Sequence, residues 1–249
     1  MRKTTLVNAH AVSHAGCQRA DNEDSVLCFT EQGLWAVADG LGGHCLGAQA
    51  SQHITAELSS IDFVPGEVIS QRLHQVVGVL AVLSAQLEER GAQLVTPNIV
   101  GSTVAVLLID ENMAGVAWSG DSRVYRFRQG ILERLTQDHT VARQLVKEHG
   151  LTQAQAARDP EANNLTQALG VPSFAPEHRA FVLAAGDWFV VCSDGLTRCV
   201  SEMAITQVLQ AHQCTQACAN ALLELALNAG APDNVSVIVV AACADALTR

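Results

Sequence analysis

The sequence predicts an α+β protein in which strands and helices are partly segregated along the chain. Strand-like stretches rich in β-branched residues follow one another through short, turn-forming connections, which favours antiparallel pairing. Helical patterns occur in separate blocks, so layered α+β architecture is favoured over a doubly wound sheet. The 249 residues are 49% hydrophobic, enough for a substantial core, and no linker calls for a second domain. Residues 1–249 are therefore expected to form a single domain.

The expected strands are short apolar runs bounded by turn residues. They cover Leu34–Ala38, Thr103–Ile109, Gly115–Trp118, Val124–Arg128, Trp188–Cys192 and Val235–Ala242. The expected helices have apolar residues at helical spacing. They cover Ala48–Leu58, Pro65–Arg90, Ser201–Ala211 and Thr215–Ala229. The polar segment His139–Asn164 predicts short helices joined by turns, and its composition fits a lid beside an active site and an ordinary surface excursion equally well.

Charge and cysteine usage restrict the partners and the compartment. The net charge of −10 disfavours nucleic acid and anionic membranes as partners. The eight cysteines include no Cys-x-x-Cys pair, which favours the reducing cytoplasm. No apolar run reaches the ~18–20 residues that a membrane helix needs, and no apolar signal core follows Met1–Thr5. A cytoplasmic protein without a membrane segment is expected.

Aspartates at the ends or corners of strand-like segments carry most of the functional information. They are Asp24, Asp39, Asp121, Asp194 and Asp233. Carboxylates that are distant in sequence can converge when each lies at a strand end, and burying them without counter-charge is costly. A hard divalent cation with oxygen ligands is the usual remedy. A Mg²⁺ or Mn²⁺ site is therefore the first hypothesis.

Asp39-Gly40 is the best candidate for the middle of such a site. A carboxylate can bridge two cations, and a glycine carbonyl can approach a metal closely. Taken alone, Asp-Gly is more often a plain strand-to-helix corner. Asp194, which also precedes a glycine, and Asp233, which lies directly before the last strand, shift the balance towards a metal site.

Two further side chains are candidates for binding a phosphate or for donating a proton during its hydrolysis. Arg19 lies five residues before Asp24 and could bind a phosphate bidentately, or it could form a surface ion pair with Asp21 or Glu23. His44 could donate a proton to a leaving alkoxide, although a lone histidine is more often structural. The sequence contains no phosphate-cradling glycine loop and no nucleophile elbow, so a metal-activated water is left as the attacking group.

The motifs, taken in order, resemble the metal-dependent Ser/Thr protein phosphatases of the type 2C (PPM) family, in their compact bacterial form. The matching stretches span nearly the whole chain. They are Arg19–Ser25, Val37–His44 with Gly47 and Ala50–Ser51, Gly101–Val104, Gly120–Arg123, Leu135–His139, Leu165–Gly170, Cys192–Leu196 and Asp233–Ser236. The resemblance implies a four-layer αββα sandwich, in which two antiparallel sheets are flanked by helices, with residues 139–164 as a small flap beside the site.

The resemblance also implies a centre of two Mn²⁺ or Mg²⁺ ions. Asp39 would bridge the ions, the Gly40 carbonyl would bind one, and Asp194 and Asp233 would bind the other. Asp24 would bind a metal directly or through water. Asp121 and Asp194 would share a third, weaker cation. Arg19 would bind the substrate phosphate.

One departure from the family pattern concerns the proton donor. Leu41 stands where other members carry Met, or a His proposed as the general acid in animal members. His44 or a water could serve instead. Many bacterial relatives carry a C-terminal membrane anchor, whereas this sequence ends at Arg249, so a free catalytic domain is expected.

The resulting expectation is hydrolysis of phosphoserine and phosphothreonine in proteins, without a phosphoenzyme. The protein would work as a monomer and oppose a Ser/Thr kinase in bacterial signalling, with kinase substrates and the kinase itself as partners. Three alternatives remain open: a phosphoprotein-binding module with a silent site, a two-metal phosphodiesterase or nuclease, and a structural protein stabilised by cations. The net negative charge argues against the nuclease.

Overall fold

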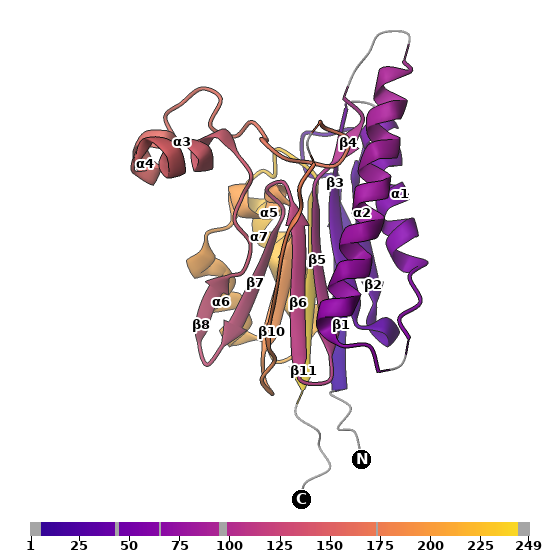
Figure 1. The fold of residues 1–249 in the computed structure, drawn as a ribbon. Helices are drawn as coiled ribbons and strands as arrows, with labels where there is room; N and C mark the ends of the chain where they lie inside the picture. Colours follow the sequence, from indigo (N-terminus) through magenta and orange to yellow (C-terminus); the bar gives the residue numbers. More distant parts are fainter. Residues whose placement is uncertain (1–5, 43–44, 65, 95–98, 173, 244–249) are drawn as a thin grey trace, which may run out of the picture.

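The computed structural model describes residues 6–42, 45–64, 66–94, 99–172 and 174–243, and in them two antiparallel sheets pack face to face (Figure 1). One sheet has the order β1-β11-β10-β7-β8, and the other β2-β3-β5-β6-β9 with β4 paired to β3. The first sheet consists of β1 (Leu6–His14), β7 (Arg123–Arg128), β8 (Ile131–Arg134), β10 (Trp188–Cys192) and β11 (Val235–Cys243). The second consists of β2 (Asp24–Phe29), β3 (Leu34–Leu41), β4 (Gly101–Ser102), β5 (Val104–Asp110), β6 (Met113–Ser119) and β9 (Glu177–Val182), with a 3₁₀ turn at Thr30–Gln32.

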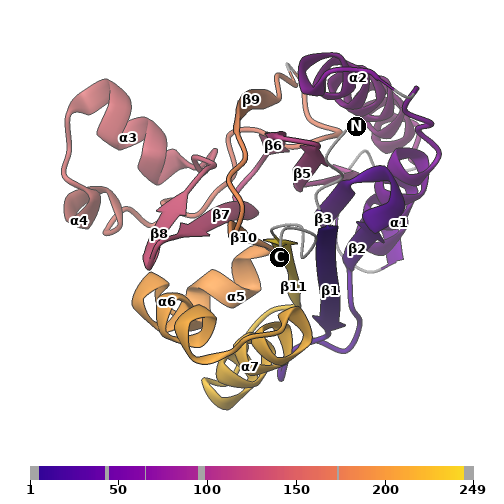
Figure 2. The same cartoon turned by 90° about the horizontal axis from the view of Figure 1, so that it is seen from below.

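Helices cover the outer face of each sheet. The second sheet is covered by α1 (Cys45–Ser59) and α2 (Ile69–Ala92). The first is covered by α5 (Asp194–Cys199), α6 (Glu202–Ala211) and α7 (Thr215–Asn228). The views in Figures 1 and 2 place α3 (Val141–His149) and α4 (Gln153–Ala156) to one side of the sandwich. The four-layer αββα sandwich predicted from the sequence is therefore confirmed.

The alternation of side chains along each strand builds three apolar layers. In β3, Leu34 and Ala36 face α1 and α2, whereas Trp35 and Val37 lie between the two sheets. All four are fully buried. Successive residues of a strand point to opposite faces, so a strand that is apolar at every position must be covered on both sides.

The elements differ from the sequence prediction mainly at their ends. The helix expected from Pro65 begins at Ile69, because Val68 is extended and its N–H donates to the Gln71 side chain. Pro65 itself lies outside the described residues. Strands β1, β2, β4, β8 and β9 and helix α5 were not expected from the sequence. Within the ranges that the structure describes, no helix is both long and apolar enough to cross a membrane.

Candidate metal centre

A cavity of about 800 Å³ lies where β3 ends and α5 begins. It brings together six of the residues predicted from the sequence to form the site. They are Arg19, Asp39, Gly40, Asp121, Asp194 and Asp233. Asp24 is buried and pairs with Asp39 in the β2–β3 register, without lining the cavity itself. His44, the predicted proton donor, lies outside the described residues.

Sheet pairing explains how carboxylates distant in sequence reach one place. Asp24 and Asp39 are direct cross-strand partners in β2 and β3. Asp194 is the first residue of α5, just after β10, and Asp233 lies two residues before β11. Because β10 and β11 are antiparallel neighbours, the end of one strand lies beside the start of the other. The Thr103 N–H donates to the Asp39 carbonyl at 2.9 Å and holds the end of β3.

The Asp24 carboxylate is only partly satisfied. Its Oδ2 accepts a hydrogen bond from the Ser193 hydroxyl at 2.8 Å. Its Oδ1 is buried and has no hydrogen-bond partner among the described residues. A buried carboxylate oxygen without a partner is costly. Such an oxygen, next to several other carboxylates, is suited to bind a hard divalent cation.

Burial and mutual repulsion raise the pKa values of these carboxyls. Burial, reinforced by the charges of Asp24, Asp194 and Asp121, raises the pKa of Asp39 well above its usual range. Burial, with the charges of Asp194 and Asp138, raises the pKa of Asp121 to about 7. Burial raises the pKa of Asp24 to about 6, although hydrogen bonds from serine side chains oppose the rise. The ionised cluster therefore needs positive charge close by.

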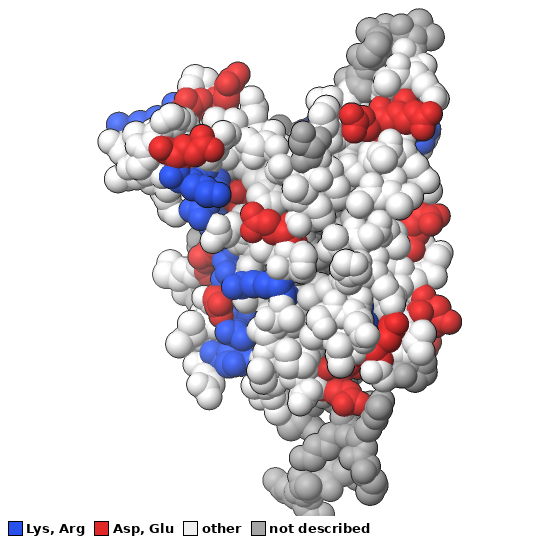
Figure 3. Space-filling model, in the orientation of Figure 1, with Lys and Arg blue, Asp and Glu red and all other residues white. Residues whose placement is uncertain are grey.

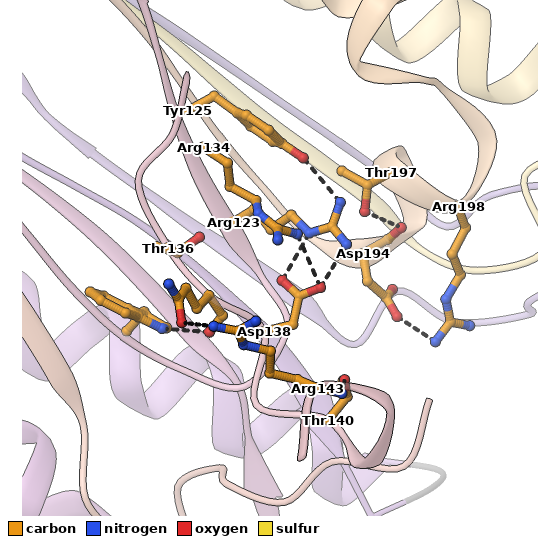
Figure 4. Close-up of polar contacts among 12 residues, drawn as sticks. Arg123, Tyr125, Arg134, Thr136, Asp138, Thr140, Arg143, Asp194, Thr197 and Arg198 are labelled. Atoms are coloured by element: carbon orange, nitrogen blue, oxygen red, sulfur yellow. Dashed lines mark hydrogen bonds and ion pairs between the residues drawn. The ribbon is translucent and has the colours of Figure 1, made fainter. Parts of the chain in front are cut away.

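Two arginines supply positive charge to the cluster. The Arg198 guanidinium pairs with Asp194, one helical turn earlier in α5 (Figure 4), and its Nη1 lies 3.4 Å from Asp233 Oδ2. Arg19 Nη2 lies 3.0 Å from the same oxygen of Asp233. Burial raises the pKa of Asp194, whereas the Arg198 charge lowers it. Among the described residues, no three His, Cys, Asp or Glu side chains are grouped closely enough to hold a metal ion.

Asn234 organises the loop that carries Arg19, a role that was not predicted from the sequence. Its Oδ1 accepts from the Glu23 N–H at 2.8 Å, and its Nδ2 donates to the carbonyls of Ala15 and Asp21, both at 2.9 Å. The residue is buried, so water competes little for these hydrogen bonds. Its place directly after Asp233 is the signal that could have indicated a structural role beside the site.

The glycines next to the aspartates allow close packing. A Cβ on Gly40 would lie 2.3 Å from the Gly47 carbonyl oxygen, so β3 could not approach α1 as it does. A Cβ on Gly195 would lie 1.9 Å from the Asn234 carbonyl oxygen. The sequence interpretation explained Gly40 by access of its carbonyl to a metal. The structure adds a packing reason for both glycines.

The predicted flap segment begins at an anchored histidine. His139 donates its N–H to the Gly120 carbonyl at 2.9 Å, and its Nδ1 accepts from the Gly120 N–H at 3.2 Å. Nε2 therefore carries the proton and faces Glu177 at 3.1 Å. Residues 163–168, at and just beyond the end of the predicted flap, line the cavity. The flap role of residues 139–164 stays a prediction.

A half-buried ion pair lies close to Asp121 in the sequence. Arg123 donates to both carboxylate oxygens of Asp138, at 2.9 and 2.7 Å, and to the Tyr125 hydroxyl at 3.0 Å (Figure 4). Bidentate pairing of this kind fixes the position of both side chains. It holds the strand that follows Asp121 against the segment that leads to the predicted flap.

Basic side chains form a band along the β7–β8 side of the face shown in Figure 3. Arginines of these strands and of β9 are paired with acidic residues. Arg126 and Arg179 face Glu133, and Arg128 forms a bidentate pair with Asp187. Their charge is therefore largely offset locally. The absence of a nucleic-acid partner stays a prediction from net charge.

Residues 12–226 match the family model described as "Protein phosphatase 2C". The serine/threonine protein phosphatase PstP of Mycobacterium tuberculosis is 36% identical over 244 residues, which cover 96% of this chain and 46% of that protein. The chain thus spans about half the length of this curated relative.

Solved structures show the same similarity in three dimensions. PppA of Pseudomonas aeruginosa superposes with a TM-score of 0.87 at 33% identity, covering 96% of this chain and 98% of that chain. The catalytic domain of PstP, solved in complex with two manganese ions, superposes with a TM-score of 0.82 at 34% identity, covering 97% and 100%. The resemblance read from the eight motifs is confirmed, and the chain belongs to the protein phosphatase 2C family.

Proposed function

We propose that the chain hydrolyses phosphoserine and phosphothreonine in proteins at a centre of two Mn²⁺ or Mg²⁺ ions. The observation that carries the proposal is one cavity lined by Asp39, Asp121, Asp194, Asp233 and Arg19. Family membership and the phosphatase names of the relatives support the same reaction. The manganese complex of the PstP catalytic domain supports the choice of metal.

The proposed ligands are those that the family resemblance implies, and the positions of four of them in the cavity wall support the assignment. Asp39 would bridge the two ions, the Gly40 carbonyl would bind one, and Asp194 and Asp233 would bind the other. Asp24, the cross-strand partner of Asp39, would bind a metal directly or through water, and its unpartnered Oδ1 supports this role. When bound, the ions supply a hydrolytic water of lowered pKa for attack on phosphorus.

A third, weaker cation is proposed between Asp121 and Asp194. Both residues line the cavity, and the Asp194 charge contributes to the raised pKa of Asp121, which supports this assignment because it indicates that the two carboxyl groups lie close together. The raised pKa of Asp121 implies that this site fills only once Asp121 has lost its proton.

Residues at the cavity wall bind the substrate. Arg19 offers two donors in a planar fork, the geometry that suits a phosphate monoester. The Arg19 side chain is 56% exposed, so it can leave Asp233 and turn to an incoming phosphate. Leu41 lines the cavity and carries no transferable proton, so the proposed donor to the leaving alkoxide is His44 or a water in the cavity.

The cellular setting is proposed on more indirect grounds. The protein would act as a monomer on phosphorylated proteins, opposite a Ser/Thr kinase. The cysteines that the structure describes are free thiols, which supports a reducing compartment such as the cytoplasm. Phosphoproteomics of a strain lacking the protein, against its parent, would identify substrates and the kinase that phosphorylates them.

Substitution of the proposed ligands tests the reaction. Asp39→Asn and Asp194→Asn should each lower Mn²⁺-dependent hydrolysis of a phosphothreonine peptide by ~10²-fold or more, because an amide is a poor ligand for a hard cation. Exposed Asp62→Asn, the same chemical change away from the cavity, should retain wild-type turnover. Phosphate release is measured with Mn²⁺ and with EDTA. Full activity of Asp39→Asn and Asp194→Asn would remove both residues from the centre.

A further inference from the structure

Arg198 forms ion pairs with two of the proposed metal ligands. It pairs with the Asp194 carboxylate, and its Nη1 lies 3.4 Å from Asp233 Oδ2. Arg198 was not among the residues predicted from the sequence, and it lines the same cavity as the aspartates. Figure 4 shows its side chain beside Asp194, with the ion pair between them.

The position of Arg198 follows from α5. A residue four places after Asp194 lies on the same face of the helix, so its side chain can reach the carboxylate. The Arg198 side chain is 44% exposed, whereas that of Asp194 is 11% exposed. An i, i+4 ion pair with a partly exposed guanidinium stabilises a helix only weakly. The stability of α5 alone is thus a weak reason for this arginine.

The charges around Arg198 indicate its role more clearly. Partial burial lowers its pKa, but the charges of Asp194, Asp121 and Asp233 outweigh this effect and raise the pKa overall. Arg198 therefore supplies positive charge to the cluster, close to where divalent ions would supply it. A carboxylate oxygen bound to a guanidinium must give up or share that contact before it binds a metal.

We propose that Arg198 is an internal counter-ion of the metal centre. It holds Asp194 and Asp233 when divalent ions are absent, and it lowers the affinity of the centre for those ions. Two costs oppose metal binding: the charge-assisted contacts to the carboxylates are lost, and the guanidinium stays near cations of the same sign. The inference rests on the proposed function, because it assumes that these aspartates bind metal.

Arg19 and Arg198 differ in the number of proposed metal ligands that they contact. Arg19 reaches Asp233 from the loop before β2, whereas Arg198 contacts both Asp194 and Asp233. Arg198 is therefore the arginine whose removal frees two proposed ligands at once. If Arg198 were purely structural, its removal would lower the stability of the protein and leave metal binding unchanged or weaker. Removal of a counter-ion would instead strengthen metal binding.

The test is calorimetric titration of Mn²⁺ into the full chain after removal of metal with EDTA and dialysis. Arg198→Gln should bind Mn²⁺ roughly tenfold more tightly than wild type. Arg198→Lys should lie between the two, because lysine keeps the charge but cannot present a planar fork to two carboxylates. Arg126→Gln, which removes an arginine paired with Glu133 outside the cavity, should bind as wild type does.

The outcomes separate this inference from the proposed function. Unchanged or weaker Mn²⁺ binding by Arg198→Gln, with normal binding by wild type, overturns the counter-ion and leaves the metal centre intact. If Arg198→Gln does not fold, Arg198→Lys decides, and an affinity no higher than wild type overturns the inference. A wild-type chain that binds no Mn²⁺ overturns the metal centre itself and the counter-ion with it.

Discussion

At the scale of single residues, the site consists of carboxylates that each need a counter-charge. Asp39, Asp194 and Asp233 could be predicted because each lies where an apolar strand begins or ends, a pattern visible in the sequence. Asn234 and Arg198 could not be predicted in the same way. The role of Asn234 depends on backbone groups more than 200 residues away in sequence, and that of Arg198 depends on Asp233, which the fold brings next to Asp194.

Arg19 offers the clearest residue-scale prediction about substrate binding. Arg19→Ala should mainly raise KM for a phosphothreonine peptide, by about tenfold, because its proposed task is to bind the phosphate. Arg134→Ala, which removes an arginine outside the cavity, serves as the control for loss of positive charge. Steady-state kinetics with saturating Mn²⁺ measures both constants. Unchanged KM and kcat in Arg19→Ala would exclude Arg19 from the site.

At the scale of elements, four of the five strands missed by the sequence prediction share one property. β1, β2, β8 and β9 are the edges of their sheets. An edge strand pairs on one side only and is often short or polar, so its sequence pattern is weak. β9, for example, is exposed at most positions. Central strands such as β5 are apolar throughout because they are covered on both faces, and these were predicted correctly.

The contact between α5 and the turn before β11 gives an element-scale prediction. Gly195→Ala should lower the free energy of unfolding by about 1–3 kcal/mol or more, because its Cβ would lie 1.9 Å from the Asn234 carbonyl oxygen. Gly78→Ala is the matched control, since nothing lies within 4 Å of its added Cβ and it is inside α2. It should stabilise the protein by about 0.5–1 kcal/mol.

Urea denaturation of both glycine variants measures these changes. A Gly195→Ala variant as stable as wild type would show that the two segments are not packed as the structure places them. The same variant should also weaken Mn²⁺ binding, because Asp194 and Asp233 flank the disturbed contact.

At the scale of the whole molecule, acidic side chains concentrated at one end of a sandwich make stability depend on pH and on metal. The pKa of Asp24 is raised from 3.8 to about 6, and that of Asp121 from 3.8 to about 7. The folded, metal-free protein therefore binds these protons more tightly than the unfolded chain does. This stabilisation is fully present below about pH 4 and is lost as the pH rises through 6 to 7.

The metal-free protein should accordingly melt at a lower temperature at pH 7.5 than at pH 5, by ~5 °C or more. Thermal melts in EDTA across this range check the prediction. In Asp121→Asn the dependence should be shallower, because one of the titrating groups is gone. Mn²⁺ should raise the melting temperature more at pH 7.5 than at pH 5, since ions bind the deprotonated carboxylates. A wild-type melting temperature that falls no more steeply between pH 5 and pH 7.5 than that of Asp121→Asn would contradict the assignment.

The position of the ions themselves is the most direct measurement. Crystals soaked in Mn²⁺ and measured at the manganese absorption edge would locate any ions by their anomalous signal. We expect two strong peaks in the cavity, with the Asp39 carboxylate touching both and Asp194 and Asp233 touching one. A cavity without anomalous peaks, or with peaks that none of these aspartates contacts, would contradict the metal centre on which the proposed function depends.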